Sequence, residues 1–312
     1  MIECLGLTRT YGDFVALNDL SLKIERGDTF GFIGPNGAGK TTTMRILSTL
    51  LEPSEGEARV GGISVTESPD EIRKILGYMP DSFGVYDGMK VWEYLDFFAG
   101  AYRIPRESRS QSIADVLELT ELGQKRDFFV EARSTGMRQR LCLAKTLLHD
   151  PQVLILDEPA SGLDPRARIE MRELLRELTR MGKTIMISSH ILPELADFCN
   201  MIGVLEAGSL ITAGRVDDIM ATLQSDRRIT VSLLRNAEKA MEFLDRDEHT
   251  SDLELKEASN PAQITFAYAG ELESLALLSH RLADPEFGLV GFEEQKTDLE
   301  DLFLRVTEGI VR

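Results

Sequence analysis

Apolar residues in the first 220 positions gather in short continuous runs that alternate with segments of helical periodicity. The runs TFGFI (29–33), VLILD (153–157) and TIMISSH (184–190) are typical of strands buried on both faces of a parallel sheet. In segments 41–51 and 165–182, apolar residues recur at the spacing of a helix with one buried face. Because strands and helices alternate, the pattern predicts an α/β core with a mostly parallel sheet.

Three segments depart from this alternation. Residues 1–25 alternate between apolar and polar positions, and 56–65 reads as a strand pair with a Gly-Gly turn, so an antiparallel β subdomain is expected. Residues 86–150 are mostly helical in spacing, which predicts a helical subdomain inserted into the core. A hairpin at 203–214 closes the region.

The pattern changes again around residues 221–228. The remaining segments read as strand, helix, strand, strand, helix, strand and a last helix at 297–309. Strand–helix–strand–strand–helix–strand is the order of a split-βαβ, ferredoxin-like unit. We therefore predict two domains, one over residues 1–225 and a small α+β accessory domain over residues 226–312.

Composition narrows the class of protein. The formal net charge is −17, which argues against a nucleic-acid-binding face and against a polybasic membrane anchor. We find no apolar run of about 18 residues and no basic leader before an apolar core, so neither a transmembrane helix nor a signal peptide is expected. Cys4, Cys142 and Cys199 are scattered among apolar neighbours, and we expect reduced, buried thiols.

The segment GPNGAGKTT fits the pattern G-x-x-x-x-G-K-[ST], a loop whose backbone N–H groups bind nucleotide phosphates. It follows a predicted strand and opens a predicted helix, whose N-terminus favours an anion. Lys40 supplies a positive charge to the β- and γ-phosphates, and the Thr41 hydroxyl suits Mg²⁺. The nucleotide-binding residues predicted here are consecutive: Gly34, Pro35, Asn36, Gly37, Ala38, Gly39, Lys40, Thr41 and Thr42.

Two adjacent acids, Asp157 and Glu158, end the buried run VLILDEP. A carboxylate at a strand end beside a phosphate loop can hold Mg²⁺, and we assign that role to Asp157. Neighbouring side chains of a strand point to opposite faces, so Glu158 is free for a different role, the orientation of water.

Five ordered motifs now resemble the ATP-binding subunit of ATP-binding-cassette (ABC) transporters over residues 1–220. The phosphate loop is similar to Walker A and VLILDEP to Walker B. RSTGMRQRL (133–141) falls where the family has LSGGQ, SGLD (161–164) matches the D-loop, and SSH (188–190) matches the switch histidine. The resemblance implies a P-loop NTPase core with ATP and Mg²⁺ as ligands.

The resemblance also assigns catalytic roles. Lys40 would stabilise charge on the β- and γ-phosphates, Glu158 would orient or activate water, and His190 would sense the γ-phosphate. For His190 the alternative is a structural histidine at a strand end.

Ser134 and Gly136 open a predicted helix, so a hydroxyl and N–H groups point out of its positive end. The resemblance implies that they cap the γ-phosphate bound by a second copy, and that Asp164 organises contacts across that dimer. The alternative is a capped surface helix. The segment departs from the family pattern at Arg133, Thr135 and Met137, which replace Leu, Gly and Gln.

Two further nucleotide contacts follow from the same resemblance. Tyr11 lies where the family has an aromatic ring that stacks on adenine, and a core tyrosine is the alternative. Asp81 replaces the usual Gln after a proline; it is shorter, charged and only accepts hydrogen bonds. We expect Asp81 to bind Mg²⁺, directly or through water, and to link closure of the site to the helical subdomain.

The function expected from this sequence is ATP binding and hydrolysis that energise export through a separate membrane-spanning permease. The C-terminal segment resembles the extension of the ABC-2 type export group. A second copy of the chain would complete the nucleotide sandwich, at the cytoplasmic face of the membrane, and nucleic acid is not an expected partner. A non-transport ABC ATPase and a hydrolysis-impaired regulatory module stay open as alternatives.

Overall fold

The computed structural model describes residues 1–82, 84, 88–130, 134–189, 195, 198–219, 227–256 and 261–295. The chain divides into two compact units, residues 1–216 and residues 217–312. The boundary expected between residues 225 and 226 lies outside the described residues, so that position stays a prediction.

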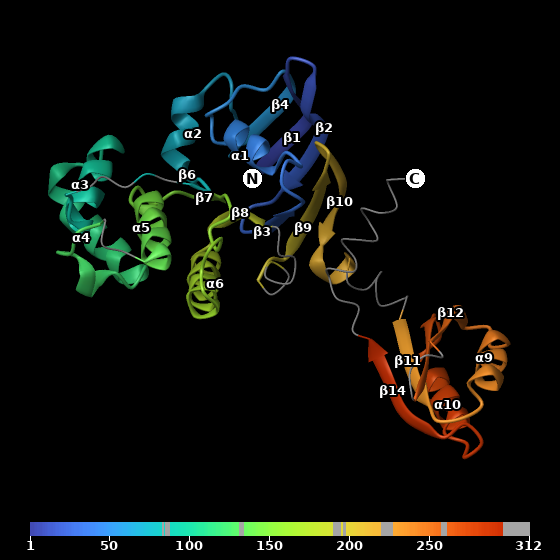
Figure 1. Cartoon of the computed structure of the whole chain (residues 1–312). Helices are drawn as coiled ribbons and strands as arrows, with labels where there is room; N and C mark the ends of the chain where they lie inside the picture. Colours follow the sequence, from blue (N-terminus) through green and yellow to red (C-terminus); the bar gives the residue numbers. More distant parts are fainter. Residues whose placement is uncertain are drawn as a thin grey trace. The chain divides into compact units, whose positions relative to one another are not determined.

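A six-stranded sheet forms the centre of the first unit, in the order β10-β9-β3-β8-β7-β6 (Figure 1). Neighbouring strands are parallel except β9 and β10, which form the expected hairpin. All residues of β3, β7 and β8 are buried, as the continuous apolar runs predict. The strands span Thr29–Ile33 (β3), Leu76–Met79 (β6), Val153–Leu156 (β7), Thr184–Ser189 (β8), Met201–Glu206 (β9) and Ser209–Arg215 (β10).

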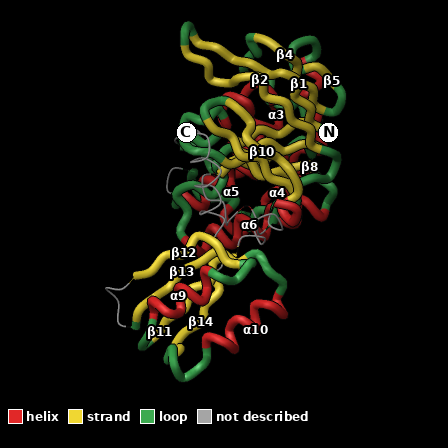
Figure 2. Tube along the Cα trace, turned by 90° about the vertical axis from the view of Figure 1, so that its right-hand side faces the viewer, coloured by secondary structure: helices red, strands yellow, loops and turns green. Residues whose placement is uncertain are grey.

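An antiparallel sheet of order β2-β1-β4-β5 packs onto this core, and Figure 2 shows its strands side by side. Ile2, Leu7, Phe30 and Val153 belong to one hydrophobic cluster, so the two sheets share a core. The Gly-Gly turn predicted from the sequence joins β4 to β5. The strands span Ile2–Tyr11 (β1), Phe14–Ile24 (β2), Glu55–Val60 (β4) and Ile63–Ser64 (β5).

Helices flank both sheets, and the predicted helical insertion is confirmed as a group that contacts the edge strand β6 through α5 (Figure 1). The helix expected at 41–51 ends at Leu47, and Thr49 just beyond it has a left-handed backbone (φ 61°). The helices span Lys40–Leu47 (α1), Pro69–Ile75 (α2), Val91–Ala101 (α3), Arg106–Leu119 (α4), Gly123–Lys125 (a 3₁₀ turn), Thr135–Leu147 (α5) and Pro165–Arg180 (α6).

The second unit has the strand–helix–strand–strand–helix–strand order that the sequence predicts. Its four strands are antiparallel in the order β12-β13-β11-β14. The unit has its own apolar core, which includes Val231, Phe266 and Leu278. The last helix expected, at 297–309, lies outside the described residues. The elements span Arg227–Leu233 (β11), Ala237–Asp245 (α9), Thr250–Lys256 (β12), Ala262–Tyr268 (β13), Leu272–Leu282 (α10) and Leu289–Gln295 (β14).

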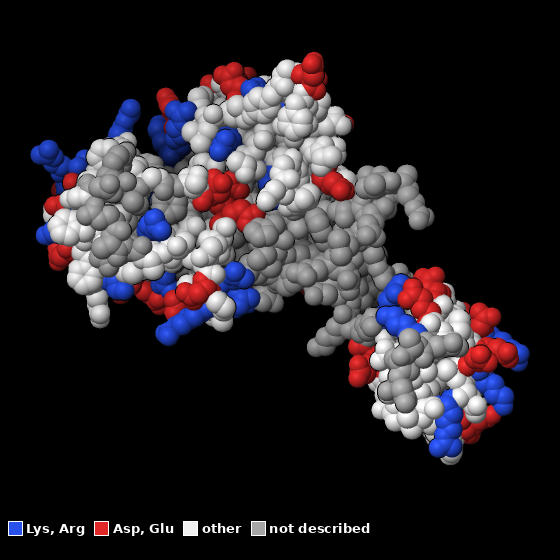
Figure 3. Space-filling view, viewed as in Figure 1, with Lys and Arg blue, Asp and Glu red and all other residues white. Residues whose placement is uncertain are grey.

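The charged surface and the cysteine thiols are two further features of the chain, and the thiols are buried, as the sequence predicts. Acidic and basic side chains are interspersed on the face shown in Figure 3. The three cysteines are free and buried, and burial raises the pKa of the Cys4 thiol to about 12, which makes it unreactive. None of the helices within the described ranges combines the length and the apolar character needed to cross a membrane.

The separate core of the second unit predicts a local effect of mutation. Phe266→Ala removes a fully buried ring, and we expect it to lower the free energy of unfolding of this unit by about 3–5 kcal/mol. Hydrogen-exchange mass spectrometry measures this through peptides from 227–256 and 261–295. Val290→Ala is the control, since its side chain is 57% exposed. Equal loss of protection in residues 1–216 would contradict independent cores.

Candidate functional site

The phosphate loop connects β3 to α1 and approaches two other strands closely. A Cβ atom on Gly34 would lie 2.3 Å from the carbonyl oxygen of Leu205 in β9. Gly39 caps α1 with φ 108°, and a Cβ there would lie 2.7 Å from the carbonyl oxygen of Ala16 in β2. Only glycine fits both positions, so the motif is required by the packing of this loop as well as by its ligand.

Lys40 lies beneath the loop, with its side chain only 7% exposed. Its Nζ donates hydrogen bonds to the carbonyl oxygens of Gly34 (2.6 Å) and Pro35 (3.2 Å), and lies 3.9 Å from Oε1 of Glu158. Burial lowers the pKa of Lys40, while the carboxylates of Glu158 and Asp157 act in the opposite direction. The ammonium group therefore lies between the loop and the acid pair, where a phosphate would meet it.

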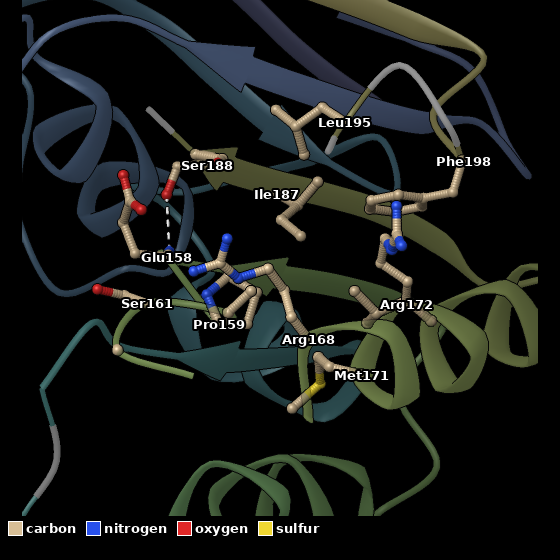
Figure 4. Close-up of a pocket in the computed structure, with 14 residues that line it drawn as sticks. Glu158, Pro159, Ser161, Arg168, Met171, Arg172, Ile187, Ser188, Leu195 and Phe198 are labelled. Carbon is tan, nitrogen blue, oxygen red and sulfur yellow. Dashed lines mark hydrogen bonds between the residues drawn. The ribbon is translucent and has the colours of Figure 1, made fainter. Parts of the chain in front are cut away.

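Asp157 is fully buried, and its two carboxylate oxygens differ in their hydrogen bonding. Its Oδ1 accepts a hydrogen bond from Ser188 Oγ at 2.6 Å, whereas Oδ2 has no hydrogen-bond partner among the described residues. Ser188 Oγ in turn accepts from the backbone N–H of Glu158 at 2.9 Å, the bond drawn as a dashed line in Figure 4. The Ser188 hydroxyl thus holds the carboxylate of Asp157 and the backbone of Glu158. Sequence reasoning included Ser188 in the motif SSH (188–190) but gave it no role, although a hydroxyl near the end of a buried strand was the available signal.

The expectation that Asp157 and Glu158 face opposite sides is wrong. Strand β7 ends at Leu156, and Glu158 has a left-handed backbone with φ 49°. Strand alternation requires an extended backbone, which has already ended there. Both carboxylates consequently line the same cavity.

That cavity, of about 270 Å³, brings most of the predicted residues together. Tyr11 lines it and is 47% exposed, so the alternative of a core tyrosine is wrong. Phe14, which sequence reasoning did not select, lines it as well. The lining consists of Tyr11, Phe14, Ala16, Pro35, Asn36, Gly37, Ala38, Gly39, Lys40, Thr41, Thr42, Asp81, Asp157 and Glu158.

Asp81 follows β6 at the edge of this cavity and is exposed. Its Oδ1 accepts a hydrogen bond from the N–H of Ser82 at 2.7 Å. The structure therefore places Asp81 with the phosphate loop and the acid pair, as the sequence predicts, while its role toward Mg²⁺ stays a prediction.

Three predicted residues lie at helix starts rather than in the cavity lining. Ser134 caps α5, and its Oγ accepts from the N–H of Met137 at 3.4 Å. Asp164 caps α6, and its Oδ1 accepts from the N–H of Ala167 at 2.9 Å. The two helix starts are neighbours, because a Cβ on Gly136 would lie 3.3 Å from that of Ala167. His190 and Arg133 lie outside the described residues.

The donor set of the cavity fits Mg²⁺ bound together with phosphates. The part of the chain that the structure describes has no group of three or more His, Cys, Asp or Glu that could hold a metal alone. The second oxygen of Asp157 and the hydroxyl of Thr41 are hard-oxygen donors in one cavity. Mg²⁺ typically takes one or two such protein ligands and completes its shell with phosphate and water.

Comparisons with known proteins agree with this geometry. The family described as "ABC transporter" matches residues 17–161. "Nod factor export ATP-binding protein I" of Rhizobium meliloti (strain 1021) is 34% identical over 310 residues, covering 98% of this chain and 88% of that protein. "Probable multidrug ABC transporter ATP-binding protein YbhF" of Escherichia coli (strain K12) is 36% identical over 228 residues, 73% of this chain but only 39% of the relative.

A solved structure extends the comparison to the fold. The "dimeric structure of a post-hydrolysis state of the ATP-binding cassette MJ0796 bound to ADP and Pi" superposes with a TM-score of 0.63 at 26% identity. The match covers 69% of this chain and 99% of that chain. The first unit therefore has the fold of an ATP-binding cassette.

The bonds of Ser188 predict the effect of removing its hydroxyl. Ser188→Ala removes the hydrogen bonds to Asp157 Oδ1 and from the N–H of Glu158, so we expect a loss of about 1–3 kcal/mol in the free energy of unfolding. We also expect Mg²⁺–nucleotide affinity to fall by about 10- to 100-fold. Urea unfolding and calorimetric titration measure these two quantities.

Ser48→Ala is the matched control. Ser48 is also buried, but its hydroxyl has no hydrogen-bond partner in the described structure. Its replacement should change neither quantity appreciably. Equal effects of the two variants would show that the bonds of Ser188 do not matter.

Proposed function

Since the chain belongs to the ABC transporter family of ATP-binding proteins, we propose that it binds and hydrolyses MgATP to energise export through a separate membrane-spanning subunit. The observation that carries the proposal is the single cavity shared by the phosphate loop, Tyr11, Asp81 and the acid pair. A purely structural glycine-rich turn would not require these groups to converge.

Binding uses both ends of the nucleotide. The loop N–H groups and Lys40 contact the β- and γ-phosphates, and the ring of Tyr11 stacks on the base. Thr41 and Asp157 would hold Mg²⁺, with Asp81 as a further ligand, directly or through water. When bound, Mg²⁺ would neutralise charge on the β- and γ-phosphate oxygens.

Hydrolysis requires an oriented water molecule beside the γ-phosphate, and Glu158 is the candidate to orient or activate it. The bond from its N–H to Ser188 fixes the start of its side chain. Lys40 lies 3.9 Å from that carboxylate and would stabilise the charge that develops on the β- and γ-phosphates. His190 would complete this group as a sensor of the γ-phosphate.

A second copy of the chain supplies the remaining contacts. Ser134 and Gly136 lie at a helix start away from the lining of the 270 Å³ cavity. Their N–H groups and hydroxyl would contact a nucleotide bound by another molecule. A similar cassette has been solved as a dimer, which supports a nucleotide sandwich of two chains.

The membrane partner would dock on a groove of about 880 Å³ between the α/β core and the helical subdomain. Phe98 of α3 and Tyr102 just after it line this groove, whereas Tyr94 of α3 is buried and belongs to the core. We would also expect the aromatic residues Phe83 and Tyr86 in this groove, and both lie outside the described residues. Docking there would hold the chain at the cytoplasmic face of the membrane, in a transporter of the ABC-2 export type.

The assignment of Glu158 predicts a variant that binds ATP without turning it over. Glu158→Gln keeps the size of the side chain but not its basicity, so we expect kcat to fall by about 10²- to 10⁴-fold with ATP affinity retained. Light scattering should then detect an ATP-dependent dimer. Glu57→Gln, a change of an exposed carboxylate on β4, is the control. Full ATPase activity in Glu158→Gln would reject the assignment.

Asp81 gives a separate test of the site. We expect Asp81→Ala to lower ATPase rates by about tenfold and to raise the Mg²⁺ concentration needed for half-maximal rate. Asp81→Gln restores a carbonyl oxygen and should recover part of the rate. Steady-state ATPase assays at varied Mg²⁺ measure both effects. Wild-type rates and Mg²⁺ dependence in both variants would remove Asp81 from the mechanism.

A further inference from the structure

A second aromatic ring lies beside Tyr11 at the cavity of the phosphate loop. Strand β1 ends at Tyr11 and β2 begins at Phe14, and the two residues are direct partners across the hairpin. Side chains directly opposite in an antiparallel pair project from the same face, with Cβ atoms about 5 Å apart. Both residues line the cavity, so the two rings form one aromatic edge.

Packing of the core does not account for Phe14. Its side chain is 62% exposed, whereas Ala16, the next residue of β2 on the same face, is buried. The residues that β1 and β2 contribute to the lining are Tyr11, Phe14 and Ala16, and none of them carries an ionised group. This part of the cavity therefore suits a flat, neutral ring system, while Lys40 and the loop suit phosphate.

Arg9 limits how Tyr11 can bind a ligand. Its guanidinium carbon lies 4.7 Å from the centre of the Tyr11 ring, and its Nη1 donates to the carbonyl oxygen of Glu52 at 3.0 Å. One face of the Tyr11 ring is thus covered by the Arg9 guanidinium, which is itself held by its hydrogen bond to Glu52. Tyr11 offers only its remaining face, and a second ring adds contact area that Tyr11 alone lacks.

We propose that Phe14 is a second base-binding residue, which contacts the nucleobase of a nucleoside triphosphate together with Tyr11. The inference rests on the proposed function, because it takes the phosphates to lie in the loop at 34–42. It adds that the base is held by two rings from one hairpin. Ring contacts need only the π face of the base and no hydrogen bond to its edge.

The test compares a ligand that has a base with one that lacks it. Isothermal titration calorimetry on the full chain would measure the Kd of MgATP and of inorganic triphosphate for Phe14→Ala, Phe14→Leu and Phe14→Trp. Val15→Ala is the matched control, since Val15 is the next residue, is 45% exposed and does not line the cavity. Alternation along the strand points it to the opposite face.

We expect Phe14→Ala to raise the Kd of ATP by about 5- to 100-fold, the range of lost base stacking, with the Kd of triphosphate unchanged. Phe14→Leu keeps apolar volume without a flat ring and should also weaken ATP binding. Phe14→Trp should retain it, and Val15→Ala should change neither Kd.

Two results would overturn the inference alone. One is wild-type ATP affinity in Phe14→Ala and Phe14→Leu, and the other is equal weakening of ATP and triphosphate binding. A wild-type chain that binds neither ligand would instead overturn the proposed function and this inference with it.

Discussion

Close contact between backbone segments fixes the phosphate loop, and the rest of the site depends on that contact. Gly34 lies against the carbonyl of Leu205, and Gly39 against that of Ala16. Leu205 belongs to the parallel sheet and Ala16 to the antiparallel one, so the loop lies where the two sheets meet. Side chains at these glycines would separate the sheets. The loop sequence therefore serves the shared core and the ligand at the same time.

The site beside this loop also buries several charged groups. Lys40, Asp157 and Glu158 bring three ionisable groups into one little-exposed place, and buried charges are tolerated only when partners satisfy them. A loop carbonyl accepts a hydrogen bond from Lys40, and the Ser188 hydroxyl donates to Asp157 and accepts from the backbone N–H of Glu158. A strand hydroxyl with one donor and two lone pairs is the smallest group that can do both. Order in the site thus comes from β8 as well as from the loop.

Much of this arrangement could be predicted from the sequence, because it rests on local pattern. Continuous apolar runs placed β3, β7 and β8, and motif spacing selected Lys40, Asp157 and Asp81. The features that the sequence did not predict depend on contacts between distant segments. Ser188 matters only because β8 lies beside β7, and Phe14 only because the hairpin meets the loop. The left-handed backbone of Glu158 follows from the chain's turn out of the sheet, which no residue-type pattern records.

The helix starts at Ser134 and Asp164 differ in charge, and that difference has a consequence for assembly. Asp164 supplies a carboxylate to the N–H groups of α6, so this helix end carries its own counterion. Ser134 supplies only a neutral hydroxyl to α5, whose end stays electropositive. By this argument the start of α5 suits an anion better than the adjacent start of α6 does. In the proposed dimer, this difference would direct a phosphate held by the second copy toward α5 rather than α6.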